Sequence, residues 1–182
     1  LGWDAIGIIK AMGKKVTHFK LSDKVFYAGA INRPGSYSEL QAVDSRIAAL
    51  SPTSISNEDA VAMPLTSLTA CEMLFERLRI TQSVPGAASA IVIIGGAGGV
   101  NSIAIQLVKA LTNLTVIATA SRPESIEWVK KMGADYVINH REPLAPQIEA
   151  LDIGQPGFVF STTNTDQYLP DIIQFIAPQG HI

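Results

Sequence analysis

The chain has 182 residues, of which 47% are hydrophobic and 16% are charged, and its formal net charge is −2. This composition is typical of a globular protein and excludes the basic surface that nucleic-acid binding requires. No apolar run is long enough to cross a bilayer and no signal-peptide pattern is present, so we expect a cytoplasmic protein without a membrane partner. The single cysteine, Cys71, excludes an internal disulfide and a cysteine-rich metal site.

The first 50 residues consist of short apolar segments separated by glycine, proline and Ser-Asp pairs. Strands are predicted at residues 4–9, 24–28 and 37–43, and their spacing favours an antiparallel β subdomain. Ser56 is predicted to cap a short helix that Pro64 interrupts. A longer helix follows, with one apolar stripe formed by Leu68, Cys71, Phe75 and Leu78.

After a linker at residues 83–89, strand and helix patterns alternate regularly to the end of the chain. The predicted strands are 91–94, 115–119, 135–138 and 157–161. The predicted helices are 99–111, 124–132, 144–151 and 166–177, the last with an apolar face of Leu169, Ile172, Ile173 and Ile176. This alternation predicts an α/β fold, a doubly wound parallel sheet with right-handed crossovers.

A glycine-rich turn lies between the first of these strands and its helix. The apolar run Ile91–Ile94 is followed by Gly95-Gly96-Ala97-Gly98-Gly99-Val100 and then by helical periodicity. Such a turn lets backbone N–H groups approach an anion, and the helix N-terminus adds a partial positive charge. The pattern predicts that Gly96, Ala97, Gly98, Gly99 and Val100 hold the pyrophosphate of a dinucleotide, with Gly96 and Gly98 facing it.

The turn departs from the G-x-G-x-x-G fingerprint at its last position, where Asn101 stands in place of glycine. The third glycine permits close packing of helix against strand, so Asn101 predicts a slightly displaced helix. A glycine-rich turn without a ligand is the alternative interpretation.

The end of the second strand favours a phosphorylated cofactor. Ser121 and Arg122 follow this strand, and no Asp or Glu lies between Arg77 and Pro123. A carboxylate at the strand tip would bind the ribose hydroxyls of NADH, whereas a serine and an arginine suit the 2′-phosphate of NADPH. Lys131 and His140 are weaker candidates for the same phosphate. For Arg122, the alternative is a solvated residue at a helix end.

Taken together, these motifs resemble the medium-chain dehydrogenase/reductase superfamily, in particular its zinc-type alcohol-dehydrogenase-like and quinone-oxidoreductase branches. The segments that carry the resemblance are 65–70, 95–100, 102–109, 119–125, 133–135, 137–140 and 177–181. The resemblance implies part of a GroES-like catalytic domain over residues 1–64 and a Rossmann NADP-binding domain over residues 65–182. Because the chain begins at Leu1 and stops where another strand is predicted, we expect it to be a fragment.

The resemblance also implies further contacts to the cofactor. Thr66 and Thr69 fall in a segment that borders the nicotinamide in relatives, and Thr162 lies where the cofactor ribose is expected. Lys131 and His140 occupy positions where quinone-oxidoreductase-like members often have a Lys and a Tyr near the 2′-phosphate. For the threonines, helix capping and packing are an equal alternative.

The zinc site of the metal-dependent relatives is not expected here. Those relatives have Gly-His-Glu where this chain has Gly2-Trp3-Asp4, and an indole N–H cannot coordinate zinc. Cys71 is predicted to be a small buried residue, and His18 and His181 lack ligand spacing. We therefore expect no metal.

The function implied is hydride transfer from NADPH to a small-molecule substrate, namely a quinone, an enal or enone, or another activated carbonyl. The alternatives are a zinc-dependent alcohol dehydrogenase and a non-catalytic NADPH-binding sensor or interaction module. No catalytic acid can be assigned, although Tyr27, Tyr37 and Ser38 are candidate pocket residues. Relatives often dimerise through a sheet edge that would lie past Ile182, so a homodimer stays among the alternatives.

Overall fold

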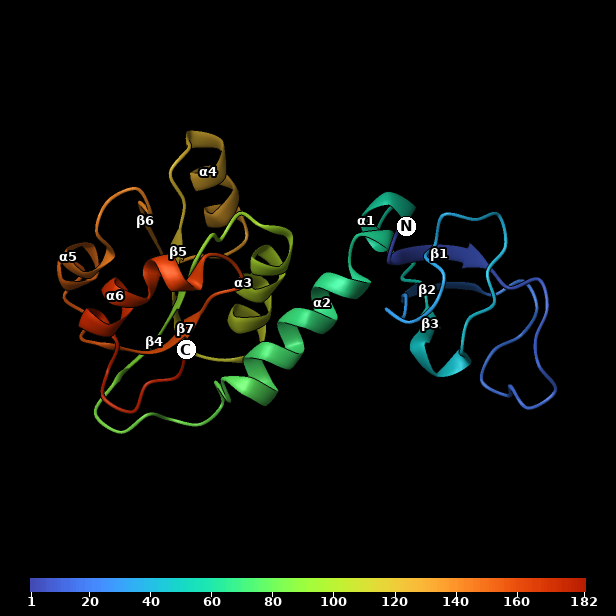
Figure 1. Cartoon of the computed structure of the whole chain (residues 1–182), viewed down its shortest axis with the longest axis horizontal. Coiled ribbons are helices and arrows are strands. Elements are labelled where there is room, and N and C mark those ends of the chain that lie inside the picture. Colours follow the sequence, from blue (N-terminus) through green and yellow to red (C-terminus); the bar gives the residue numbers. More distant parts are fainter. The chain divides into compact units, whose positions relative to one another are not determined.

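The computed structural model describes all 182 residues, which divide into two units, Leu1–Leu68 and Thr69–Ile182. Figure 1 shows the helices and strands of both units. No helix has the length and apolar character needed to span a membrane.

The first unit is built on an antiparallel sheet with the order β1-β2-β3, as predicted from the sequence. Its strands are β1 (Asp4–Ile8), β2 (Lys24–Ala28) and β3 (Ala48–Leu50). The prediction of a strand at residues 37–43 is wrong. Gln41 in that segment accepts a hydrogen bond from the Tyr27 hydroxyl at 2.6 Å and donates to the Pro34 carbonyl at 2.9 Å. Side-chain hydrogen bonds, rather than pairing with a neighbouring strand, hold this loop.

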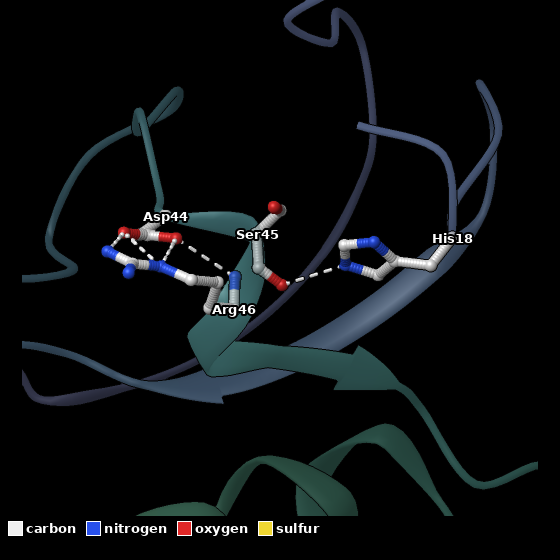
Figure 2. A network of polar contacts seen from close by, with 4 residues as sticks. All are labelled: His18, Asp44, Ser45 and Arg46. Carbon is white, nitrogen blue, oxygen red and sulfur yellow. Dashed lines mark hydrogen bonds and ion pairs between the residues drawn. The ribbon is translucent and has the colours of Figure 1, made fainter. Parts of the chain in front are cut away.

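A polar network fixes the approach to β3 (Figure 2). Asp44 caps the short 3-10 helix η1 (Ser45–Ile47), and its carboxylate accepts from the backbone N–H and the guanidinium of Arg46. These hydrogen bonds hold the pKa of Asp44 well below its usual range. The His18 ring lies 3.1 Å from the Ser45 carbonyl, which ties the loop after β1 to this turn. Because the network is exposed to solvent, it orients the turn before β3 but contributes little to the free energy of unfolding.

Two helices follow. In α1 (Asn57–Val61) the Ser56 hydroxyl accepts from the Asp59 N–H at 3.0 Å, which confirms the predicted cap. Helix α2 (Pro64–Cys71) begins at Pro64 and continues into the π-helical segment η2 (Glu72–Arg77). Ala70, Leu74 and Leu78 are buried, and Leu68 is 61% exposed, so the predicted stripe is wrong at Leu68.

The second unit contains a four-stranded sheet in which every neighbouring pair is parallel, as predicted. The strands β4 (Ala88–Ile93), β5 (Thr115–Thr119), β6 (Tyr136–Ile138) and β7 (Pro156–Phe160) lie in the order β6-β5-β4-β7. The helices are α3 (Gly99–Leu111), α4 (Pro123–Lys131), α5 (Leu144–Glu149) and α6 (Thr165–Phe175).

Helices cover both faces of this sheet (Figure 1). Ile91 and Ile93 of β4 pack in one core with residues of α3 and α4. Val92 and Ile94 pack in a second core with residues of α5 and α6. Burial on both sides explains why the run around β4 is apolar without alternation.

The last helix differs from its prediction. Ile172 and Phe175 of α6 are buried, whereas Ile173 is 64% exposed and Leu169 is 39% exposed. The helix therefore faces the sheet through a stripe rotated from the predicted one. His181 follows α6 and forms a parallel bridge with Phe158 of β7.

Candidate functional site

The turn between β4 and α3 is fixed to the end of β5. Gly95 has a φ of +70°, a conformation that favours glycine, and its N–H donates to the Thr119 hydroxyl at 2.8 Å. The N–H of Gly96 donates to the Thr119 carbonyl at 3.0 Å. Thr119 is fully buried, and its two hydrogen bonds anchor the turn to the end of β5.

Gly96 lies under the turn and is buried. A Cβ at this position would lie 2.9 Å from the Ala118 Cβ and 3.0 Å from Val129 Cγ1. The residue thus permits α4 to pack closely on the sheet. Because its N–H is already bonded to Thr119, Gly96 has no donor left to face a phosphate.

The exposed part of the turn is the start of α3. Gly98 is the N-cap, and Gly98 and Gly99 are exposed. The amides of Gly99 and Val100 stand in the first turn of the helix, where no intrahelical acceptor is available. These donors, with the positive end of the helix dipole, suit an anion.

A cavity of about 410 Å³ adjoins this turn at the carboxyl ends of β4, β5 and β6. Gly95, Ala97 and Gly98 line it on one side, and Ser125 of α4 lines it on another. In parallel α/β sheets, ligands bind in the crevice at this edge.

The polar wall of the cavity comes from the segments after β5 and β6. Ser121, Arg122, His140 and Arg141 line it, and none of the cavity's residues is acidic. The Ser121 hydroxyl lies 3.1 Å from His140 Nε2. Arg122 is exposed at the N-cap of α4, and its guanidinium makes no hydrogen bond or ion pair.

The pKa of the His140 imidazole lies below its ordinary value. Burial lowers the pKa of its imidazole, and the positive charges of Arg141 and Arg122 lower it further, while the Thr119 carbonyl acts in the opposite direction. Its buried Nδ1 atom makes no hydrogen bond of good geometry. An anion in the cavity would favour protonation of this ring.

Asn101 closes the turn from the helix side. It is 3% exposed, and its Nδ2 donates to the carbonyls of Ile94 and Gly95, each at 2.8 Å. Its Oδ1 accepts from the Thr162 hydroxyl at 3.1 Å. The residue that replaces the third glycine therefore connects the turn to the loop after β7.

Two of the predicted cofactor residues in the second unit, Lys131 and Thr69, do not line this cavity. Lys131 is the last residue of α4 and lies 5.8 Å from the centre of the Trp128 ring. Helical rise places it roughly 13 Å along the axis from Arg122. The Thr66 hydroxyl donates to the Ala62 and Met63 carbonyls of its own helix region. Thr69 stands at the start of the second unit and does not line the cavity.

Sequence reasoning missed Arg141, Ser125 and Thr119, all of which line the cavity. Arg141 and Thr119 could have been predicted, because both lie at the carboxyl end of a predicted parallel strand and ligands of α/β sheets bind at that edge.

Comparisons with known proteins agree with this geometry. Residues 99–182 match the family described as zinc-binding dehydrogenase. A zinc-type alcohol dehydrogenase-like protein from Staphylococcus aureus is 46% identical to this chain. The match covers the whole of this chain and 54% of that protein. A crystal structure from Rhizobium etli, described as a zinc-dependent alcohol dehydrogenase, is 54% identical to this chain and superposes with a TM-score of 0.95. The match covers 98% of this chain and 52% of that one. The Escherichia coli quinone oxidoreductase complexed with NADPH is 30% identical with a TM-score of 0.80, over 99% of this chain and 53% of that one.

This chain belongs to the medium-chain dehydrogenase/reductase superfamily. Its parallel sheet is that of a Rossmann domain, and its antiparallel strands are part of a GroES-like domain. The chain spans about half the length of the curated relatives it matches, 54% for the S. aureus protein.

The residues present do not fit the zinc site that the family's name implies. No group of three or more His, Cys, Asp or Glu side chains could hold a metal ion. Trp3 has no lone pair to offer a metal, and Cys71 is half-buried on a helix. His181 Nδ1 lies 2.7 Å from the Leu78 carbonyl. Of the candidate pocket residues in the first unit, Tyr27 is bonded to Gln41 and Tyr37 is 82% exposed.

Proposed function

We propose that the chain is part of an NADPH-dependent oxidoreductase that transfers hydride to a quinone, an enal or enone, or another activated carbonyl without catalytic zinc. Residues 1–64 would belong to the catalytic domain and residues 65–182 to the NADP-binding domain. One observation carries the proposal: a cavity with two arginines, a histidine and no carboxylate adjoins an exposed helix N-terminus.

The residues present fit NADPH. Its pyrophosphate would bind the N–H groups of Gly99 and Val100, where the dipole of α3 favours negative charge. Its 2′-phosphate would enter the cavity, where Arg122 and Arg141 offer charge-assisted hydrogen bonds and Ser121 offers a hydroxyl. The cofactor supplies the hydride, and the protein binds and orients it.

The polar residues that line the cavity also disfavour the binding of NADH. A carboxylate at the end of β5 would accept hydrogen bonds from the ribose diol of NADH, and this position holds Ala120 and Ser121 instead. Without a 2′-phosphate, the positive charges of Arg122 and Arg141 would have no partner. The preference for NADPH over NADH is therefore electrostatic, and it should become smaller as salt is added.

The test compares two cations at opposite ends of α4. Calorimetric titration of Arg122→Ala should show an NADPH affinity about ten- to a hundredfold lower, with little change for NADH, because one charged hydrogen bond is lost. Lys131→Ala removes the same charge from the other end of the helix and should leave both affinities within twofold. Equal losses for both cofactors in Arg122→Ala would show that Arg122 does not bind the 2′-phosphate.

The names of the relatives favour a zinc-dependent alcohol dehydrogenase as the second candidate. Stoichiometric zinc in a full-length preparation, lost together with activity on chelation, would support it. NADPH binding without oxidation across a panel of quinones and enals would instead indicate a sensor or interaction module.

A further inference from the structure

The amide of Asn101 has only one possible orientation. Its Nδ2 lies 2.8 Å from two carbonyl oxygens, those of Ile94 and Gly95. An oxygen in that position would face two acceptors with no proton between them, so the flipped amide is excluded. Oδ1 must therefore point at Thr162.

This orientation sets the direction of the next hydrogen bond. Asn101 Oδ1 can only accept, so the Thr162 hydroxyl, 3.1 Å away, must donate its single proton to it. The remaining lone pairs of Thr162 Oγ1 are then available, and the atom acts purely as an acceptor. A hydroxyl that is free to rotate would offer a donor and an acceptor equally.

Thr162 stands where the second half of a dinucleotide would lie. It is exposed in the loop after β7, and the neighbouring Thr163 methyl lies 3.7 Å from the Cβ position of Gly95. Strand β4 has two neighbours, β5 and β7. If the adenosine end occupies the cavity beyond β5 and β6 and the pyrophosphate lies on the turn after β4, the other end must extend toward β7.

We infer that Asn101 is a positioning residue: it fixes Thr162 as a hydrogen-bond acceptor for a hydroxyl of the nicotinamide ribose. The inference rests on the proposed function and adds a specific part to it. Asn101 stands in the place of the third glycine, and its hydrogen bonds link the turn after β4 to the loop after β7. A ribose hydroxyl is a donor that matches the lone pairs of Thr162.

Two ligands separate this role from a purely structural one. NADPH contains the nicotinamide ribose, whereas adenosine 2′,5′-bisphosphate carries the adenosine phosphates and lacks it. Thr162→Val keeps the shape of the side chain and removes the acceptor. We expect about three- to tenfold weaker NADPH binding, the effect of one hydrogen bond, and an affinity for the bisphosphate within twofold of the parent chain. Thr162→Ser keeps the hydroxyl and should bind both ligands normally.

The role of Asn101 is tested by a double-mutant cycle. In an Asn101→Gly background the Thr162 hydroxyl is no longer held in one orientation, so Thr162→Val should weaken NADPH binding by a smaller factor than it does in the parent chain, and an equal factor in both backgrounds would refute the role of Asn101. If Asn101→Gly fails to fold, the Thr162 variants alone decide the question.

The outcomes distinguish the two proposals. If the parent chain binds adenosine 2′,5′-bisphosphate but Thr162→Val has no effect on NADPH, or weakens both ligands equally, the role of Asn101 and Thr162 is refuted and the cofactor proposal stands. If the parent chain binds neither ligand, both proposals are refuted. Thermal melting of each variant shows whether a loss of affinity reflects unfolding.

Discussion

Replacing Gly96 by alanine tests whether this glycine is required for packing. Its φ is not positive, so alanine has no backbone strain to overcome. The new methyl, however, would lie 2.9 Å from the Ala118 Cβ and 3.0 Å from Val129 Cγ1, and both neighbours are fully buried. Carbon atoms in contact are normally about 3.5–4.0 Å apart, so α4 or β5 must move by several tenths of an ångström. Overpacking of this kind costs about 1–3 kcal/mol.

For a chain of this size, that cost lowers the melting temperature by about 2–12 °C. Circular dichroism of the ligand-free protein would measure it. Ala118→Gly removes the nearer of the two clashing carbons, so the double variant Gly96→Ala/Ala118→Gly should lose less stability than the two single losses added together. A Gly96→Ala protein that melts with the parent chain, or a strictly additive cycle, would refute the packing role.

Two further outcomes are expected. Gly98→Val should abolish NADPH binding while the protein stays folded, because a branched side chain at the N-cap would cover the exposed N–H groups of α3; unchanged affinity in a titration would remove the turn from the site. The pH dependence of stability should include a part from His140: its folded pKa lies below the ordinary value of 6.5, so protonation favours the unfolded state and stability is lost as the pH falls below that value. Melting temperatures at pH 7.5 and 5.5 should therefore differ less in His140→Gln than in the parent chain, and an equal difference would contradict this assignment.

The parallel half of the fold was predictable because its signals are local and agree with one another. Helix α3 and strand β5 have their predicted bounds, since a glycine-rich turn and apolar runs mark their ends. The errors arose where tertiary contacts decide. Leu68 of α2 is exposed although it belongs to the predicted apolar stripe, and the hydrogen bonds of Gln41 hold residues 37–43 as a loop where a strand was predicted.

The candidate site was predictable at its charged end and less so at the turn. Ser121, Arg122 and His140 line one cavity because the strands before them are adjacent and parallel. Lys131 does not line this cavity, and helical periodicity alone does not indicate which end of a helix a ligand approaches. The bonds of Asn101 join residues distant in the sequence, and no pattern within its own segment indicates them.

The glycines of the turn meet separate physical requirements. Gly95 permits a positive φ, Gly96 permits close packing of α4, and Gly98 leaves the start of α3 open. Only the last of these bears directly on an anion. A match to the fingerprint therefore indicates a strand–turn–helix geometry and an available helix end, but it does not distinguish between phosphorylated ligands. That choice depends on charge beyond the neighbouring strands, where Arg122 and Arg141 meet at one cavity although nineteen positions separate them in the sequence.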